Sequence, residues 1–196
     1  MTYITSYRHP RIAVDLDNTL AGTVKAQLKT YKKEGIKIRK GDIHTPDIQT
    51  ELLRLGNIKP DKSNAVLAKI WENTKSMPLQ DKSTVPVMNL ISSLYSVTIL
   101  TATIADLALI KEWLSINSII YRNIIKLPYK DKVRFVKECH IHMFIDDDPI
   151  LAKEVDRSDK KVIVINQPWN NSVAENSNIR RAKSWSDVPA LLDHWE

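Results

Sequence analysis

The sequence has few of the features that mark membrane, secreted or disulfide-stabilised proteins. It contains one cysteine, Cys139, which cannot form an intramolecular disulfide and which we interpret as a small packing residue of a helix. No apolar run approaches the roughly 18 residues that a transmembrane helix needs. The first residues also lack the apolar stretch and small-residue cleavage site of a signal peptide. We therefore expect a cytoplasmic protein with no membrane contact.

Cysteine and histidine clusters with the spacing of zinc ligands are absent too, so the sequence does not favour a zinc site. The charge, in contrast, is unevenly distributed. Residues 21–75 hold twelve Lys or Arg against six Asp or Glu, which accounts for the whole net charge of +6. Such a basic segment attracts anionic ligands, including nucleotides or nucleic acid. A solvated helical face is the simpler explanation of the same residues.

Strands and helices alternate along most of the chain. The first predicted strand, residues 11–17, is followed by a polar, Lys-rich segment with helical spacing, for example at Leu52, Leu53 and Leu55. Further strands are predicted at 97–100, 119–125, 143–145 and 162–165, and helices at 85–95, 105–116, 131–139, 149–155 and 186–194. This order predicts an α/β fold: a Rossmann-like parallel sheet with helices on both faces and a small helical insertion after the first strand.

Polar side chains follow three of these strands at the point where each ends. The first strand carries Asp15 and Asp17, the second ends at Thr101, and the fourth runs into Asp146, Asp147 and Asp148. The carboxyl ends of parallel strands meet at one edge of a sheet, where ligands bind. Several carboxylates at one point repel one another unless a cation binds between them. Oxygen ligands of this type favour a hard ion, and Mg²⁺ binds through one or two carboxylates together with substrate phosphate.

Such a cluster is suited to phosphoryl transfer. One carboxylate can attack phosphorus and form an aspartyl-phosphate. A second carboxylate two residues later lies on the same side of an extended segment and can serve as acid and base. Taken singly, each motif has a plainer explanation: a turn or a structural calcium site for Asp15 and Asp17, a helix cap for Thr101, and a helix start for residues 146–148. Their order and spacing together are far more specific.

The residues Asp15-Leu-Asp-Asn-Thr19, Thr101, a lysine upstream of the fourth strand, and Phe144-Ile-Asp-Asp-Asp148 resemble the four motifs of the haloacid dehalogenase (HAD) superfamily. The resemblance implies a core domain of residues 1–20 and 81–196 and a helical cap of residues 21–80. It also implies a Mg²⁺ cofactor, with Asp15 as the nucleophile and Asp17 as the acid/base. The metal ligands would be Asp15, the Asp17 carbonyl and Asp147, with Asp146 beside it. Thr101, Ala102 and Lys132 would bind the phosphate.

Two details of these motifs stay open. Lys130 is the alternative to Lys132, which we prefer because it begins an apolar-periodic helix, as in relatives of this type. Asn18 stands where the nucleotidase branch often has glycine, and asparagine tolerates the unusual backbone angles of such a turn.

The C-terminal part narrows the resemblance. Val164–Asn170 and Arg180–Val188 look like the tail of the 5'(3')-deoxyribonucleotidase branch, which implies a deoxynucleoside monophosphate as the small phosphorylated substrate. In the predicted cap, Trp71 and Tyr31 are candidates to stack on a base, and Lys25 or Lys29 to hold phosphate. The alternative is that Trp71 packs the interior of the cap.

Three functions therefore compete. The first is a magnesium-dependent deoxyribonucleotidase, and the second is a phosphatase for nucleic-acid ends or for another small phosphorylated metabolite. The third is a HAD-like binding protein without catalysis, which has no need of both Asp15 and Asp17. The sequence does not select the base, the sugar, the phosphate position or the oligomeric state.

Overall fold

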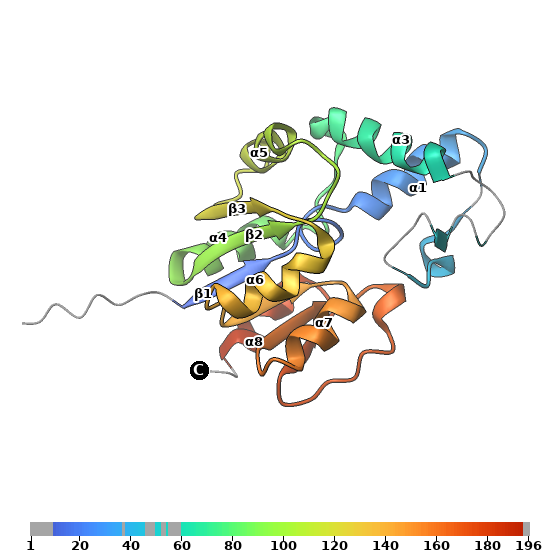
Figure 1. Cartoon of the computed structure of the whole chain (residues 1–196). Helices are drawn as coiled ribbons and strands as arrows, with labels where there is room; N and C mark the ends of the chain where they lie inside the picture. The colour runs from blue at the N-terminus through green and yellow to red at the C-terminus, as the bar shows by residue number, and fades with distance from the viewer. Residues whose placement is uncertain (1–9, 37, 46–49, 52–53, 55–59, 194–196) are drawn as a thin grey trace, which may run out of the picture.

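The computed structural model describes residues 10–36, 38–45, 50–51, 54 and 60–193. The predicted helical spacing at Leu52, Leu53 and Leu55 lies outside these residues, as does the end of the predicted last helix at His194. The described chain forms one six-stranded parallel sheet in the order β3-β2-β1-β4-β5-β6 (Figure 1). The strands are β1 Arg11–Val14, β2 Ser96–Thr101, β3 Asn123–Lys126, β4 Met143–Asp146, β5 Lys161–Ile165 and β6 Ile179–Ala182.

The sheet is buried on both faces because apolar side chains alternate along its central strands. In β1, Ile12 and Val14 belong to one apolar cluster, and Ala13 between them belongs to the other. The first cluster includes residues of α4, α5 and α8, and the second includes residues of α6 and α7. The helices are α4 Thr84–Leu94, α5 Leu107–Ile116, α6 Lys132–Glu138, α7 Pro149–Asp156 and α8 Val188–Asp193. The predicted α/β parallel-sheet fold is confirmed.

The described part of the segment between β1 and α4 is mainly helical, as predicted. It contains α1 Thr23–Lys33, the 3₁₀ turn η1 Lys40–Asp42, α3 Pro60–Glu72 and the 3₁₀ turn η2 Thr74–Ser76. Helices α1 and α3 contact each other apart from the sheet (Figure 1).

The two ends of this segment meet at its base. The Gly22 N–H donates to the Pro78 carbonyl at 2.7 Å, and the Gln80 N–H donates to the Leu20 carbonyl at 2.8 Å. These bonds lie where the boundaries of the insertion, residues 21 and 80, were predicted. The division into core and cap domains itself stays a prediction.

Three strands differ from the sequence prediction. Strand β1 ends at Val14 rather than at residue 17, because the chain leaves the sheet toward the turn in which Asn18 has a φ of 59°. Strand β3 begins at Asn123 rather than residue 119, because Ser118 has a φ of 55° and the Ile119 N–H bonds back to the Leu114 carbonyl, closing α5. Strand β6 was not predicted at all. It is an edge strand whose two central residues are Arg180 and Arg181, so it lacks the apolar run of a buried strand. None of the helices in the described part of the chain has the length and apolarity to cross a membrane.

Candidate active site

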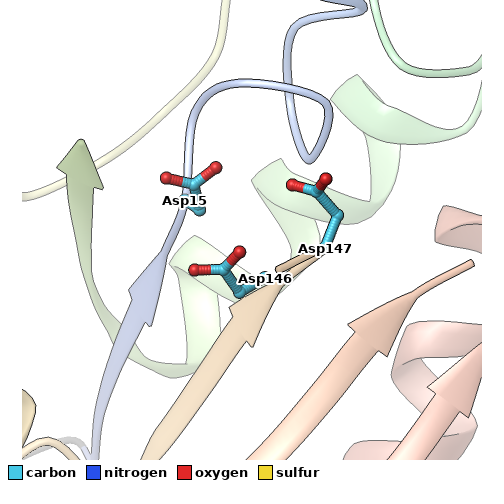
Figure 2. A group of neighbouring side chains, drawn as sticks. All are labelled: Asp15, Asp146 and Asp147. Atoms are coloured by element: carbon cyan, nitrogen blue, oxygen red, sulfur yellow. The ribbon is translucent and has the colours of Figure 1, made fainter. Parts of the chain in front are cut away.

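Three aspartates from two neighbouring strands meet at the carboxyl edge of the sheet. Asp15 directly follows β1, Asp146 is the last residue of β4, and Asp147 comes next. One carboxylate oxygen from each lies within 4.8 Å of the others, and all three residues are buried. Figure 2 shows the three carboxylates gathered beyond the strand ends. The structure thus brings together three of the predicted metal ligands, although Asp15 lies more than a hundred residues before Asp146 and Asp147 in sequence.

The turn after β1 directs the chain from the sheet into the insertion. Asn18 adopts a φ of 59°, the left-handed conformation that asparagine tolerates better than most residues. Its side-chain oxygen accepts hydrogen bonds from the Thr23 hydroxyl at 3.0 Å and from the Val24 N–H at 2.8 Å, at the start of α1. Asparagine therefore both makes the turn and ties it to the first helix, and the expectation about Asn18 is confirmed.

Lys132 provides the positive charge among the acids. It begins α6, is 4% exposed, and its ammonium donates to Asp15 and, at 3.5 Å, to Asp146. Although burial disfavours the ammonium, the carboxylates of Asp146 and Asp15 raise the pKa of Lys132 above its ordinary value. Lys130, the alternative phosphate ligand, has an exposed side chain. The geometry therefore favours Lys132.

The carboxyl groups hold their protons more tightly than usual. Burial, partly offset by Lys132, raises the pKa of Asp15 to about 6. Burial also raises the pKa of Asp17 to about 6, against hydrogen bonding from Thr103, and the pKa of Asp146 to about 8. The pKa of Asp147 is raised as well, by burial and then by Asp146. A site with these properties favours either protons or a cation.

The donor set fits Mg²⁺. It consists of carboxylate oxygens, which this hard cation prefers, and ligands on opposite sides of a Mg²⁺ ion lie about 4.2 Å apart. One carboxylate oxygen from each of the three aspartates lies within 4.8 Å of the other two, which is compatible with that distance. In the described residues this is the one group of three or more acidic, His or Cys side chains with metal-ligand spacing. A divalent cation there would offset the mutual repulsion of the buried carboxylates.

We expect stability to depend jointly on pH and Mg²⁺. Without metal, the folded chain binds more protons than the unfolded chain between pH 4 and 8, since the pKa values of Asp15 and Asp146 are raised to about 6 and about 8. The free energy of unfolding should therefore fall as the pH rises through this range. Mg²⁺ at a hundredfold excess over its Kd should restore about 2.7 kcal/mol at pH 8 and much less at pH 5.

Urea unfolding with EDTA or MgCl₂ at both pH values measures this effect, with KCl at matched ionic strength as the control. An equal effect of Mg²⁺ at the two pH values would contradict it.

Of the two threonines at and just after the end of β2, Thr103 lines the cavity and Thr101 does not. Thr101 is fully buried, and its Oγ1 accepts the Thr103 N–H at 3.1 Å. Ala102 and Thr103 line the cavity above the acids, whereas Thr101 is not among its lining residues. Thr103 was missed because it stands two positions after the motif residue. Phosphate binding by Thr101 and Ala102 stays a prediction.

The C-terminal segment that resembles the nucleotidase tail forms hydrogen bonds to the loops that carry Asn18 and Asp147. The indole N–H of Trp169 donates to Asp147 Oδ2 at 2.9 Å, and the hydroxyl of Thr19 donates to Asp147 Oδ1 at 3.1 Å. The Gln167 side-chain amide donates to the Asn18 carbonyl at 2.9 Å. None of these three donors, Thr19, Gln167 and Trp169, lines the cavity. In this structure the segment orients the acids rather than forming the wall of the pocket.

A cavity of about 640 Å³ opens above the acids, between the insertion and the core. Asp15, Asp17, Lys132 and Asp146 to Asp148 are among the residues that line it. Both parts of the chain contribute to the wall. Its other lining residues include Thr23, Val24, Gln27, Thr45, Thr50 and Leu67 from the insertion, and Ile104, Tyr129, Ile150 and Leu151 from the core.

The predicted pocket residues of the insertion need correction. Trp71 and Tyr31 are both 0% exposed, and neither lines the cavity. Trp71 instead packs edge-on against Trp113 of α5, with ring centroids 6.1 Å apart. It is therefore a packing residue, but this aromatic partner belongs to the core part of the chain and not to the interior of the cap. Lys25 donates to the Gln80 carbonyl, and Lys29 is exposed outside the cavity lining. The helical spacing of apolar residues and the residue type do not distinguish a buried aromatic side chain from one that faces a ligand.

No protein-family model and no curated protein matches the sequence. Solved structures match in three dimensions. A haloacid dehalogenase-like hydrolase from Streptococcus pneumoniae aligns over 93% of this chain and 98% of its own, with a TM-score of 0.66 and 14% identity. The fold is that of the haloacid dehalogenase hydrolases.

Two further HAD-fold structures align over similar lengths. A predicted phosphoglycolate phosphatase from Haemophilus somnus aligns over 94% of this chain and 98% of its own, with a TM-score of 0.61 and 11% identity. CbbY from Rhodobacter sphaeroides, solved in complex with phosphate, aligns over 91% and 95%, with a TM-score of 0.59 and 14% identity. At these identities the likeness concerns the fold, and the chemistry has to be argued from the residues of this chain.

Proposed function

We propose that this protein is a magnesium-dependent phosphomonoester hydrolase that acts through an aspartyl-phosphate on Asp15. The observation that carries the proposal is the grouping of Asp15, Asp146 and Asp147 within 4.8 Å beside the buried ammonium of Lys132, in the wall of a cavity that Asp17 also lines. A structural ion site requires neither a buried lysine nor an additional carboxylate facing a cavity of substrate size.

In the first half of the reaction, a carboxylate oxygen of Asp15 attacks phosphorus and the ester P–O bond breaks. The leaving oxygen takes a proton from Asp17, which lines the same cavity. Burial raises the pKa of Asp17 to about 6, which keeps part of its population protonated near neutral pH. Lys132 stabilises the negative charge on the phosphoryl oxygens.

In the second half, Asp17 acts as a base. Its carboxylate takes a proton from water while the water oxygen attacks phosphorus. The bond between phosphorus and the Asp15 oxygen then breaks, which releases inorganic phosphate and restores both aspartates. When bound, Mg²⁺ held by Asp15, Asp146, Asp147 and the Asp17 carbonyl would supply positive charge for the phosphoryl oxygens.

The finer part of the proposal is a deoxynucleoside monophosphate substrate. It rests on the resemblance of Val164–Asn170 and Arg180–Val188 to the deoxyribonucleotidase tail, and two features of the cavity support it. A volume of about 640 Å³ suits a nucleotide, and small-molecule pockets typically measure about 300–1,000 Å³. Lys132 is also the only Lys or Arg among the described lining residues, so a substrate with a second anionic group, such as phosphoglycolate, would find no partner for it.

A panel of phosphomonoesters with MgCl₂ tests the proposal. It should contain deoxy- and ribonucleoside monophosphates, small sugar phosphates, phosphoglycolate and end-phosphorylated oligonucleotides. Preferred hydrolysis of the deoxynucleotides supports the full proposal. A preference for oligonucleotides that falls steeply with salt would replace the substrate with a nucleic-acid end. No hydrolysis of any phosphomonoester would leave the non-catalytic binding protein.

Substitution of Lys132 by alanine is expected to lower kcat on the best substrate by about 10²–10³-fold, because the phosphoryl charge loses its buried partner. Lys130→Ala is the matched control: two residues earlier, exposed, and outside the cavity lining, it should change kcat less than about 2-fold. Steady-state kinetics and circular dichroism on both variants measure the effect. Equal losses in the two variants would remove Lys132 from its role.

A further inference from the structure

Three apolar side chains at the cavity stand out because they are exposed. In the described residues, the exposed large apolar side chains include Ile104 at 52%, Tyr129 at 44% and Ile150 at 55%, and these three line the cavity. They come from three separate core segments: the loop after β2, the turn before α6, and the start of α7. We name these three residues the apolar rim. An exposed apolar patch beside a reactive group marks a binding surface.

The side chain of Tyr129 is held in place by a hydrogen bond from its hydroxyl group. Its hydroxyl donates to Asp148 Oδ2 at 2.9 Å, and Asp148 Oδ1 accepts the N–H groups of Ile150 at 2.7 Å and Leu151 at 3.1 Å. One carboxylate therefore joins Tyr129 to the start of α7, where Ile150 lies. A surface fixed in this way binds a ligand with little loss of side-chain freedom.

The charge of the cavity limits what the apolar rim accepts. Asp15, Asp17 and Asp146 to Asp148 all line the cavity, and Lys132, its only lysine or arginine in the described residues, already contacts Asp15 and Asp146. An anionic group on the leaving part of the substrate would be repelled. The insertion adds two apolar residues, Val24 and Leu67, to the lining of the same cavity.

We infer that the apolar rim binds the leaving group of the substrate, and that this leaving group is uncharged and carries a flat, apolar ring system, as a nucleoside does. This inference rests on the proposed hydrolase function, and it places substrate selection on the core rather than on Trp71 and Tyr31. A planar ring that stacks on Tyr129 and contacts the two isoleucines of the same cavity wall would be bound without strong selection of one base.

Paired substrates and paired variants test the inference. The two substrates are thymidine 5'-monophosphate and glycerol 3-phosphate, which share the phosphomonoester but differ in the ring. Tyr129→Ala and Ile150→Ala should each raise KM for the nucleotide by roughly 5- to 20-fold and change KM for glycerol phosphate less than about 2-fold. Tyr129→Phe keeps the ring and should stay within about 3-fold of the parent protein.

Ile120→Ala is the matched control for Ile150→Ala. Ile120 is 58% exposed, close to the 55% of Ile150, but does not line the cavity, so both KM values should be unchanged. Equal effects of Ile150→Ala and Ile120→Ala, or equal changes for both substrates, would overturn the inference. So would a loss in Tyr129→Phe as large as in Tyr129→Ala, because Tyr129 would then act through Asp148.

A binding measurement separates this inference from the hydrolase proposal. Calorimetry with thymidine 5'-monophosphate uses the Asp15→Asn chain, alone and combined with Ile150→Ala. If the parent protein hydrolyses nothing but this binding weakens with Ile150→Ala, the rim inference stands and the hydrolase proposal fails. If the parent protein hydrolyses the nucleotide but Ile150→Ala does not change its affinity, the rim inference fails and the hydrolase proposal stands.

Discussion

Asp15→Asn is expected to abolish turnover, with kcat at least about 10⁴-fold lower, because removal of a covalent nucleophile costs up to about 10⁶-fold in other enzymes. Asparagine keeps the size of the side chain but is too weak a nucleophile to form the acyl phosphate. The fold should survive, since a buried carboxyl group whose pKa is already raised to about 6 contributes little stability as an anion. Stopped-time assays on the best substrate, with phosphate release as the signal, measure the loss.

The covalent intermediate provides the second readout for Asp15. Mass spectrometry of acid-quenched parent protein should find phosphate on the peptide that carries Asp15, and Asp15→Asn should carry none. Asp106→Asn, an exposed aspartate at the start of α5 with no side-chain capping bond, is the control and should keep full activity. Phosphate on another peptide, or a kcat for Asp15→Asn within tenfold of the parent, would show that another group attacks.

The acidic site was predictable because its geometry follows from topology. In a parallel sheet the strand ends share one edge, so Asp15 and Asp146 had to approach each other once β1 and β4 were neighbours. The residue types at these ends then indicate the ion and the chemistry. Lys132 was predictable for a related reason: it begins a helix that packs beside the strand carrying Asp146, with only ten residues between that lysine and β4.

The substrate end of the cavity was not predictable in the same way. Whether Trp71 faces a ligand or Trp113 depends on how α3 packs against α5, and the apolar period of α3 is compatible with both. Tyr129, Ile104 and Ile150 are separated in sequence and follow no shared pattern, so only the folded chain brings them to one cavity. Strand β6 was missed because it is an edge strand, which needs no continuous apolar run.

The C-terminal segment whose sequence resembles a deoxyribonucleotidase has a structural role as well. In the structure Gln167 and Trp169 bond to the loops of Asn18 and Asp147, and the Trp185 indole donates to the Thr19 carbonyl at 2.6 Å. The aspartates need to be oriented whichever phosphomonoester is the substrate. These hydrogen bonds explain part of the resemblance by their effect on the acidic loops, so the proposed deoxynucleotide substrate also needs the support of the cavity wall.

Asp17→Asn is expected to separate the two halves of the reaction. Its kcat on a nucleotide should fall by about 10²–10⁴-fold, because the leaving oxygen loses its proton donor. With p-nitrophenyl phosphate, whose leaving group needs no proton, the first half should proceed while the second stalls for want of a base. Rapid-quench kinetics should then find a burst of nitrophenol equal to the enzyme concentration and a phosphoenzyme that accumulates on Asp15. Linear release without a burst would assign Asp17 to metal binding or folding instead.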